Sequence, residues 1–297
     1  MQQSLAFNII KIVLVMVLLT VFGWVIMRYS HIAHAVSAAP TISLVGVISL
    51  YGLSHVFRMV RLALLTLDQR KQILPLVTMH AVTAFPSSFF PFKIGEVLRL
   101  IGLFALFDNK HKALAIWLVE RFGDISVISL FILLLYLFDV AIPQALGYVF
   151  ILFISVSVLS LLAFYATAKM LLFLNRYLVL SSSTARGLRI LRASHQLRHL
   201  EATIIASLEG RFFAMLLTSV AIWACEILAV VAFIRSVSTS LNEITTYFIS
   251  ILSGNVPPVL SGVIETFTIN KSVTLAAMAV VFSLITLVVL QLRRANS

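Results

Sequence analysis

The sequence predicts an all-α polytopic membrane protein, with about six transmembrane helices and two re-entrant broken hairpins in two inverted repeats. Apolar residues make up 61% of the 297 residues and charged residues 11%, whereas a soluble domain is roughly 45–50% apolar and about 25% charged. Several apolar runs reach the length of about 20 residues that crosses a bilayer, and two further uncharged stretches are interrupted by proline and glycine. This composition excludes a soluble globule and a disordered chain.

Six segments are long and apolar enough to be membrane-spanning helices. For the first of them a cleaved signal peptide is the alternative, because Ser37-Ala38-Ala39 resembles a cleavage site. Arg28 interrupts the path from the apolar run to that site, which favours a retained helix. The predicted spans are residues 8–27, 41–65, 113–138, 145–168, 212–234 and 272–291.

Two uncharged stretches break their own helical pattern. Residues 72–92 contain three prolines, and residues 244–264 contain Pro257 and Pro258 between two glycines. Proline removes a backbone donor, and broken backbone at membrane depth is tolerated only inside protein or beside a wet cavity. We therefore predict re-entrant hairpins near 72–99 and near 244–265, with two ordinary kinked spans as the alternative.

The distribution of Lys and Arg predicts the orientation in the membrane. The net charge is +11, and the segment 169–211 holds seven basic residues against Glu201 and Glu209. Because basic loops stay on the cytoplasmic side, we expect both termini on the cytoplasmic side of a cell inner membrane. We expect the basic side chains to contact anionic phospholipid of the inner leaflet and not nucleic acid. The halves 1–138 and 139–297 then share an order of elements with opposite topology, as in the inverted repeats of many transporters.

Residues 189–209 have the pattern of an amphipathic helix within the basic segment. Apolar residues recur on one face from Ile190 to Leu208, so we expect this helix to lie on the inner leaflet. His195 and His199, spaced i and i+4, could bind a metal, but no carboxylate completes a zinc-protease pattern between them. We predict no metal site and no cofactor.

Charged residues at membrane depth are the candidate binding residues, because each costs about 2.5–3.5 kcal/mol at the bilayer centre on the insertion scale. Glu96 and Arg99, spaced i and i+3, share a helix face if the helix resumes after Pro91. Lys93 lies at the break itself. A juxtamembrane turn with a surface ion pair is the alternative for this group.

Glu120, Arg121 and Asp124 form a second group, about one third into a predicted span. Glu120 and Asp124 lie on one face at i and i+4, where two carboxylates repel unless a cation joins them. Arg121 lies on the adjacent face, so we expect a base from another helix, and we predict that Arg99 supplies it in one polar site. An interhelical ion network that stabilises the fold is the alternative.

Three more charged residues complete the predicted set. Glu226 is a lone acid in an apolar helix, and Arg58 lies deep in the second span, where it faces protein or a lipid headgroup. Glu265 follows the second break, where Lys271 is a nearby partner. We predict no catalytic residue; the predicted substrate-binding residues are Lys93, Glu96, Arg99, Glu120, Arg121, Asp124, Arg58, Glu226 and Glu265.

Two linked motifs resemble a known family. The pattern Pro91-x-Lys93-x-Gly95-Glu96-x-x-Arg99, followed by Glu120-Arg121-x-x-Asp124, is similar to the hallmark of the lysylphosphatidylglycerol synthase transmembrane family, which includes the flippase domain of multiple peptide resistance factor. Lys93 replaces the family's usual Arg, which keeps the charge but loses bidentate phosphate geometry. In the second half the match, Gly262-x-x-Glu265, is looser.

The resemblance implies transport of lipids with polar headgroups. It does not imply lipid aminoacylation, which in bifunctional members belongs to a soluble C-terminal domain that is not expected here. We therefore expect a flippase or scramblase-like transporter that moves an aminoacylated phospholipid or a polyprenyl-linked sugar between leaflets. The alternative is a polytopic transferase, or an accessory subunit, acting on a lipid-linked donor.

No phosphate loop, dinucleotide fingerprint or kinase signature occurs in the sequence. We therefore expect no enzyme activity and no ATP-driven movement. The partners that we expect are membrane lipids and the lipid-linked substrate. Both a monomer and a homodimer are compatible with the sequence.

Overall fold

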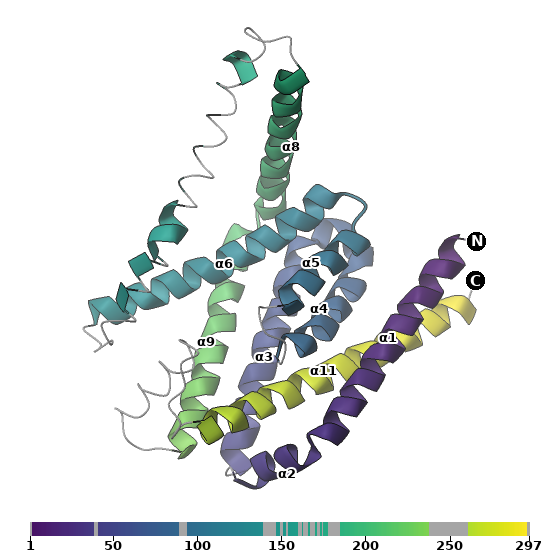
Figure 1. Cartoon of the computed structure of the whole chain (residues 1–297), viewed down its shortest axis with the longest axis vertical. Coiled ribbons are helices and arrows are strands. Elements are labelled where there is room, and N and C mark those ends of the chain that lie inside the picture. Colours follow the sequence, from purple (N-terminus) through teal and green to yellow (C-terminus); the bar gives the residue numbers. More distant parts are fainter. Residues whose placement is uncertain are drawn as a thin grey trace. The chain divides into compact units, whose positions relative to one another are not determined.

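The computed structural model describes residues 2–38, 41–88, 94–138, 185–237 and 261–295, with short stretches between 147 and 177. Every regular element in these residues is a helix and none is a strand, which confirms the all-α prediction. In chain order (Figure 1) the elements are α1 (Gln2–Met27), α2 (Tyr29–Ala38), α3 (Thr41–Leu65), the short 3-10 helix η1 (Leu67–Gln72), α4 (Ile73–Ser87), α5 (Ile94–Leu106), α6 (Lys110–Leu137), α8 (Ala185–Leu208), α9 (Phe212–Val237) and α11 (Ser261–Ala295).

Three of these helices are long and apolar enough to cross a membrane, as judged from the described residues. They are Leu44–Leu65 in α3, Phe212–Ile234 in α9 and Glu265–Leu292 in α11, and each coincides with a predicted span. A shorter apolar helix, Lys11–Met27, lies in α1. Two predicted spans are not among these candidates. The span 113–138 falls in α6, which carries five charged residues, three of them inside the predicted span. Residues 145–168 lie largely outside the described residues.

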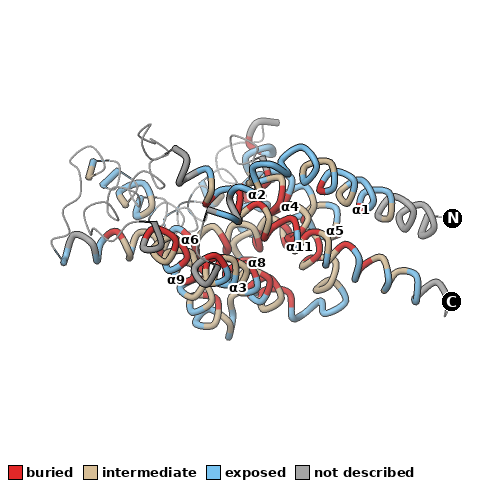
Figure 2. Tube along the Cα trace, turned by 90° about the horizontal axis from the view of Figure 1, so that it is seen from below, coloured by how far each residue is buried: buried red, intermediate tan, exposed pale blue. Residues whose placement is uncertain are grey.

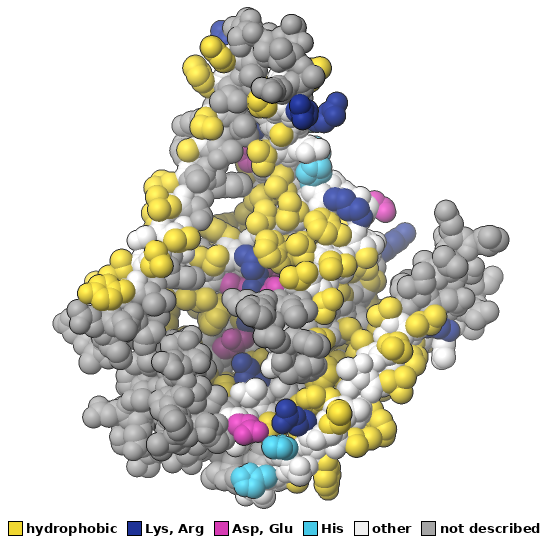
Figure 3. All heavy atoms as spheres, viewed as in Figure 1, with side chains coloured by type: hydrophobic (Ala, Val, Ile, Leu, Met, Phe, Trp, Pro, Cys, Tyr) yellow, Lys and Arg dark blue, Asp and Glu magenta, His cyan; other side chains and the backbone are white. Residues whose placement is uncertain are grey.

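Large apolar side chains on the outside of the helices account for the apolar composition. Phe22 of α1 is 65% exposed and Val288 of α11 is 53% exposed. Yellow side chains cover the visible face of both helices in Figure 3, and pale blue marks exposed positions along α1 in Figure 2. Exposed apolar surface of this extent is typical of a protein whose solvent is lipid.

The first predicted hairpin, near 72–99, consists of two short helices. α4 and α5 have 15 and 13 residues, or about 22 Å and 20 Å at 1.5 Å per residue, and each is shorter than a hydrocarbon core of about 30 Å. Residues 89–93 between them lie outside the described residues. Two helices too short to span support a re-entrant hairpin, and its entry into the membrane stays a prediction.

The second predicted hairpin, near 244–265, lies mostly outside the described residues, which resume at Ser261. There the structure corrects one boundary, because α11 runs without a break from Ser261 to Ala295 and the predicted start at residue 272 is eleven residues too late. The sequence has no proline after Pro258, so nothing interrupts the backbone ladder. Glu265 and Lys271 therefore lie on one continuous helix.

The chain forms two compact units, residues 1–102 with 221–297, and residues 103–220. In the first unit α11 is central, because α1, α2, α3 and α4 all pack against it. Its core includes Tyr51, Phe85 and Leu275, and the Trp24 ring meets Phe85 edge-on at 5.5 Å between centroids. Thr78 and Thr286 share a hydrogen bond of 2.6 Å that joins α4 to α11.

The two chain ends lie at the same end of the first unit, because α1 and α11 run side by side in opposite directions (Figure 1). This arrangement places both ends in one compartment if both helices span the membrane. The identity of that compartment, and the inverted relation between the halves 1–138 and 139–297, stay predictions.

The second unit pairs α6 with α8. Asn109 Oδ1 caps α6 by accepting from the backbone N–H of His111 at 3.0 Å, and Lys112 Nζ donates to Ser207 Oγ on α8 at 3.2 Å. α8 confirms the helix predicted at 189–209: Ile204 and Ser207 are buried. Arg and His side chains are exposed along α8 in Figure 3, while its position on a leaflet stays a prediction.

Candidate functional site

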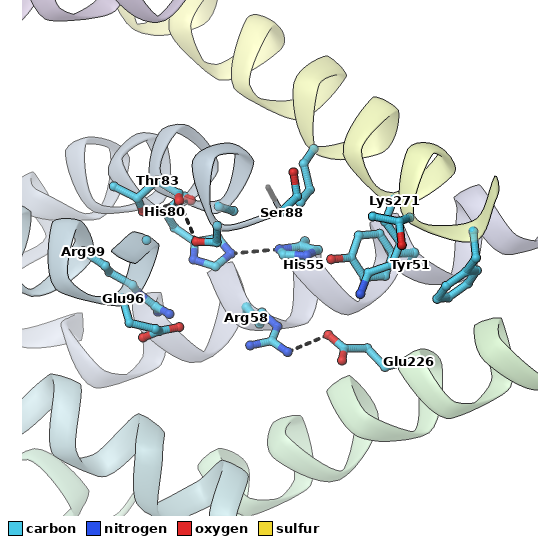
Figure 4. Close-up of a pocket in the computed structure, with 16 residues that line it drawn as sticks. Tyr51, His55, Arg58, His80, Thr83, Ser88, Glu96, Arg99, Glu226 and Lys271 are labelled. Carbon is cyan, nitrogen blue, oxygen red and sulfur yellow. Dashed lines mark hydrogen bonds and ion pairs between the residues drawn. The ribbon is translucent and has the colours of Figure 1, made fainter. Parts of the chain in front are cut away.

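A polar cavity of about 460 Å³ lies within the first unit, between α3, α4, α5, α9 and α11. This volume falls in the range of about 300–1,000 Å³ that small-molecule sites occupy. Figure 4 shows the charged and aromatic side chains that converge on it, with Arg99 and Glu96 at one end, Arg58 in the middle and Lys271 at the other end. Such a cavity among apolar helices is the natural candidate for a functional site.

Helical spacing explains why each helix contributes several residues to this cavity. Tyr51, His55 and Arg58 lie at i, i+4 and i+7 of α3, so they share one face. On α4 the polar residues His80, Thr83 and Ser87 lie at i, i+3 and i+7 and also share one face. Two polar faces from consecutive helices therefore meet at the cavity.

An ion pair joins α3 to α9 at the middle of the cavity. Arg58 Nη2 lies 2.6 Å from Glu226 Oε1, and the two side chains are only 13% and 21% exposed. Ser54 Oγ also donates to this carboxylate oxygen, at 3.5 Å. Glu226, the lone acid of an apolar helix, therefore has a cation beside it, as its burial requires.

A histidine pair joins α3 to α4. His55 Nδ1 lies 3.2 Å from His80 Nε2, and the residues are 6% and 3% exposed. One nitrogen of this contact must accept, so at least one of the two imidazoles is neutral. The outer nitrogens, His55 Nε2 and His80 Nδ1, are buried and have no hydrogen-bond partner among the described residues. Both histidines line the cavity.

Lys271 brings a further positive charge from α11. Its ammonium lies over the ring of Tyr51, 4.9 Å from the centroid, and 5.6 Å from that of Phe267. These are cation–π distances. The predicted partner Glu265 is not its partner: Glu265 Oε1 instead pairs with His31 Nδ1 at 3.2 Å, at a half-exposed position.

The physical reason for this correction is the continuous helix α11. Two residues six positions apart on an α-helix point about 120° away from each other. Lys271 therefore faces the polar cavity, whereas Glu265 lines a separate cavity of about 280 Å³ with His31 and His34 of α2.

Four of the nine predicted binding residues line the polar cavity: Arg58, Glu96, Arg99 and Glu226. Arg99 is 3% exposed, and Glu96 precedes it by one turn of α5. Gly95 also lines the cavity, and a Cβ placed there would overlap the Ser87 side chain. The glycine thus permits the close approach of α5 to α4 that sets Glu96 in position. Lys93 lies outside the described residues.

Glu120, Arg121 and Asp124 lie on α6 in the second unit. Glu120 and Asp124 are 0% and 5% exposed, which confirms that the two acids face the protein interior. Arg121 Nη2 lies 3.2 Å from Asp124 Oδ2, so the two residues form an ion pair at i and i+3. This pair was not predicted, because Arg121 was expected to lie on an adjacent face of the helix. The contact of this group with a base from another helix stays a prediction, as does its joining with Arg99 into one site.

Sequence reasoning missed Tyr51, His55, His80 and Lys271 as cavity residues. A signal for His80 was present: it starts a polar row that continues at i+3 and i+7 through the uncharged stretch 72–92. No such signal existed for Lys271, whose orientation depends on the continuity of α11. No group of three His, Cys, Asp or Glu that could hold a metal ion occurs among the described residues.

The family model of the lysylphosphatidylglycerol synthase transmembrane region matches residues 8–292, nearly the whole chain. The chain belongs to this family. Neither a curated protein nor a solved structure shows significant similarity to it. In this member of the lysylphosphatidylglycerol synthase transmembrane family, Glu96 and Arg99 of the first motif line the cavity of the first unit, and Glu120 and Asp124 of the second motif are buried in the second unit.

Proposed function

We propose that the protein moves a lipid with a polar headgroup between the leaflets of the cell membrane, as a flippase or scramblase-like transporter. The observation that carries this proposal is the cavity, where five charged residues line one space inside an apolar helical unit: Arg58, Glu96, Arg99, Glu226 and Lys271. Charge at membrane depth is a functional hypothesis by default, and membership of a lipid-related membrane family supports it.

The proposed mechanism separates the two parts of the lipid. The headgroup enters the cavity and exchanges water for charged and polar side chains, while the tails stay beside exposed apolar surfaces of the helices. The side chains replace the hydrogen bonds of water, which lowers the cost of carrying a polar group across the hydrocarbon. Basic side chains on α8 hold the protein to the anionic inner leaflet.

Leaflet exchange in proteoliposomes tests this function. The purified full chain is reconstituted with a fluorescent lipid, and a membrane-impermeant quencher reports the fraction of lipid in the outer leaflet over time. Exchange above that of protein-free vesicles, with the lipid chemically unchanged, supports the transporter. No exchange, together with a covalent change of a lipid-linked donor, would favour the transferase. Inactivity in both assays would favour an accessory subunit.

A further inference from the structure

We propose that the cavity of the first unit holds a phosphate-bearing headgroup of net negative charge, and that Lys271 and the His55–His80 pair select it. This inference rests on the proposed transport function and names its substrate class. It follows from the charge inside the cavity, from the surroundings of Lys271, and from the hydrogen-bonding capacity of the histidine pair.

The charge lining the cavity is positive. Among the side chains that line the cavity, three are cationic and two are carboxylates, so the lining carries a formal charge of +1 with neutral histidines: Arg58, Arg99 and Lys271 against Glu96 and Glu226. A net charge in a low-dielectric cavity is stabilised by a ligand of opposite charge. Phosphate is the commonest anionic group of membrane lipids, so the headgroup that we infer is a phosphate ester whose other substituents are uncharged.

Lys271 is the cation with room for this anion. The nearby carboxylate of Glu226 already has Arg58 at 2.6 Å, and Lys271 has no ion pair among the described residues. Its ammonium instead rests over the faces of Tyr51 and Phe267. An ammonium held by ring faces keeps its hydrogen-bond donors available, so a phosphate oxygen can accept from it.

The neutral histidine pair always has one donor among its two outer nitrogens. If His80 donates from Nε2 to His55, then His55 carries its own proton on the outer Nε2; if His55 donates from Nδ1, then His80 carries its proton on the outer Nδ1. Either tautomer of the neutral pair therefore leaves one outer nitrogen as donor and the other as acceptor, and both nitrogens lack a partner. Because both outer nitrogens are buried, the rings must turn toward the cavity, and a phosphate oxygen and a headgroup hydroxyl then satisfy them together.

The same arrangement excludes a cationic headgroup. An aminoacyl ester adds ammonium groups beside Lys271 and Arg58, where like charges repel in a largely desolvated space. Repulsion of the cationic lipid is sufficient for selectivity, even without an additional favourable contact to the anionic lipid. The cavity is thus suited to an anionic lipid and unsuited to a lysyl ester of the same phospholipid.

Binding of short-chain lipids to the purified full chain in detergent tests the charge class. The probes are dihexanoyl phosphatidylglycerol, its lysyl ester and dihexanoyl phosphatidylcholine, with glycerol phosphate and inorganic phosphate as lipid-free probes. We expect the anionic lipid to bind at least about tenfold more tightly than the lysyl ester and to be displaced only weakly by the lipid-free probes. Equal or tighter binding of the lysyl ester would overturn the inference, and binding of free phosphate without binding of the lipid would overturn the lipid assignment.

Two variants assign the selectivity to Lys271. Lys271→Gln should reduce the preference for the anionic lipid at least about tenfold, whereas Lys71→Gln, which removes the same charge at an exposed position of η1, should leave it unchanged. If Lys271→Gln does not fold, the wild-type comparison of the two phospholipids still decides the charge class. An unchanged preference in a folded Lys271→Gln protein would overturn the role of Lys271.

Leaflet exchange of the same headgroups separates this inference from the proposed function. Faster exchange of the cationic than of the anionic lipid would overturn the charge class and leave transport standing. If no lipid exchanges but the anionic lipid binds tightly and selectively, the transport function is overturned and the inferred anionic substrate class is supported. Exchange that follows the binding preference supports both.

Discussion

Arg58 Nη2 lies 2.6 Å from Glu226 Oε1, and this ion pair joins two residues that are 168 positions apart in the sequence. It is a charged contact between α3 and α9 in the first unit, and it borders the polar cavity. An ion pair in this place has two roles. It stabilises the packing of the two helices, and it contributes to the charge that a headgroup meets in the cavity.

Removal of one partner should destabilise the protein. We expect Arg58→Ala or Glu226→Ala to lower the stability by about 2–5 kcal/mol, because each removes the opposite charge that lies 2.6 Å from a largely buried partner. The double variant Arg58→Met/Glu226→Leu should recover most of that loss, since an apolar pair of similar volume needs no compensation. Thermal unfolding in detergent measures both, with Glu209→Ala, at an exposed position, as the control. Single variants as stable as the wild type would contradict the pair's structural role.

The histidine contact should show energetic coupling. His55→Leu leaves His80 Nε2 buried without its partner, and we expect a loss of about 1–3 kcal/mol; His80→Leu should behave in the same way. In the double variant the loss should be smaller than the sum of the two, because neither unpaired nitrogen remains. Strictly additive shifts of the unfolding temperature would show that the 3.2 Å contact contributes nothing.

Much of the helical framework could be predicted from the sequence. Apolar runs of the length of a bilayer marked α3, α9 and α11, and a polar face within a basic segment marked α8. Glu96, Arg99 and Glu226 could be singled out because a charge in lipid needs compensation. These predictions use only local patterns, so they did not require knowledge of how the helices pack.

The composition of the cavity could not be predicted in the same way. His55, His80 and Lys271 come together only because the polar faces of α3, α4 and α11 meet, and no local pattern records which faces meet. The expected pairing of Lys271 with Glu265 was wrong because both residues were placed before a helix that was predicted to start at residue 272. Both instead lie on α11, where they point in different directions.

Gly95 should not tolerate a side chain. A Cβ there would overlap Ser87, including its backbone, so Gly95→Ala should cost about 1–3 kcal/mol. The matched control is Gly46→Ala in α3, where a Cβ meets nothing within 4 Å and where alanine has the higher helix propensity. Unfolding temperatures of the two variants should therefore move in opposite directions. A Gly95→Ala protein with wild-type stability would show that α4 and α5 do not need this close approach.

Variants of Arg99 distinguish a role of this residue in transport from a structural role. We expect Arg99→Ala to abolish lipid exchange while the protein remains monodisperse in detergent, and Arg99→Lys to restore part of the exchange because it keeps the charge without the guanidinium fork. A structural role would instead lower the folding yield, since a buried carboxylate left without its cation costs about 3–5 kcal/mol. Normal exchange by a well-folded Arg99→Ala protein would remove Arg99 from the site.

The most direct measurement is an experimental structure of the full chain in a phosphatidylglycerol nanodisc, at a resolution that shows density for lipid headgroups. We predict a headgroup inside the cavity of the first unit, with a phosphate oxygen within hydrogen-bond distance of Lys271 and with a hydrogen bond to an outer nitrogen of the His55–His80 pair. Headgroup density confined to the outer surface or to the smaller cavity beside Glu265, with the polar cavity filled only by water, would contradict it.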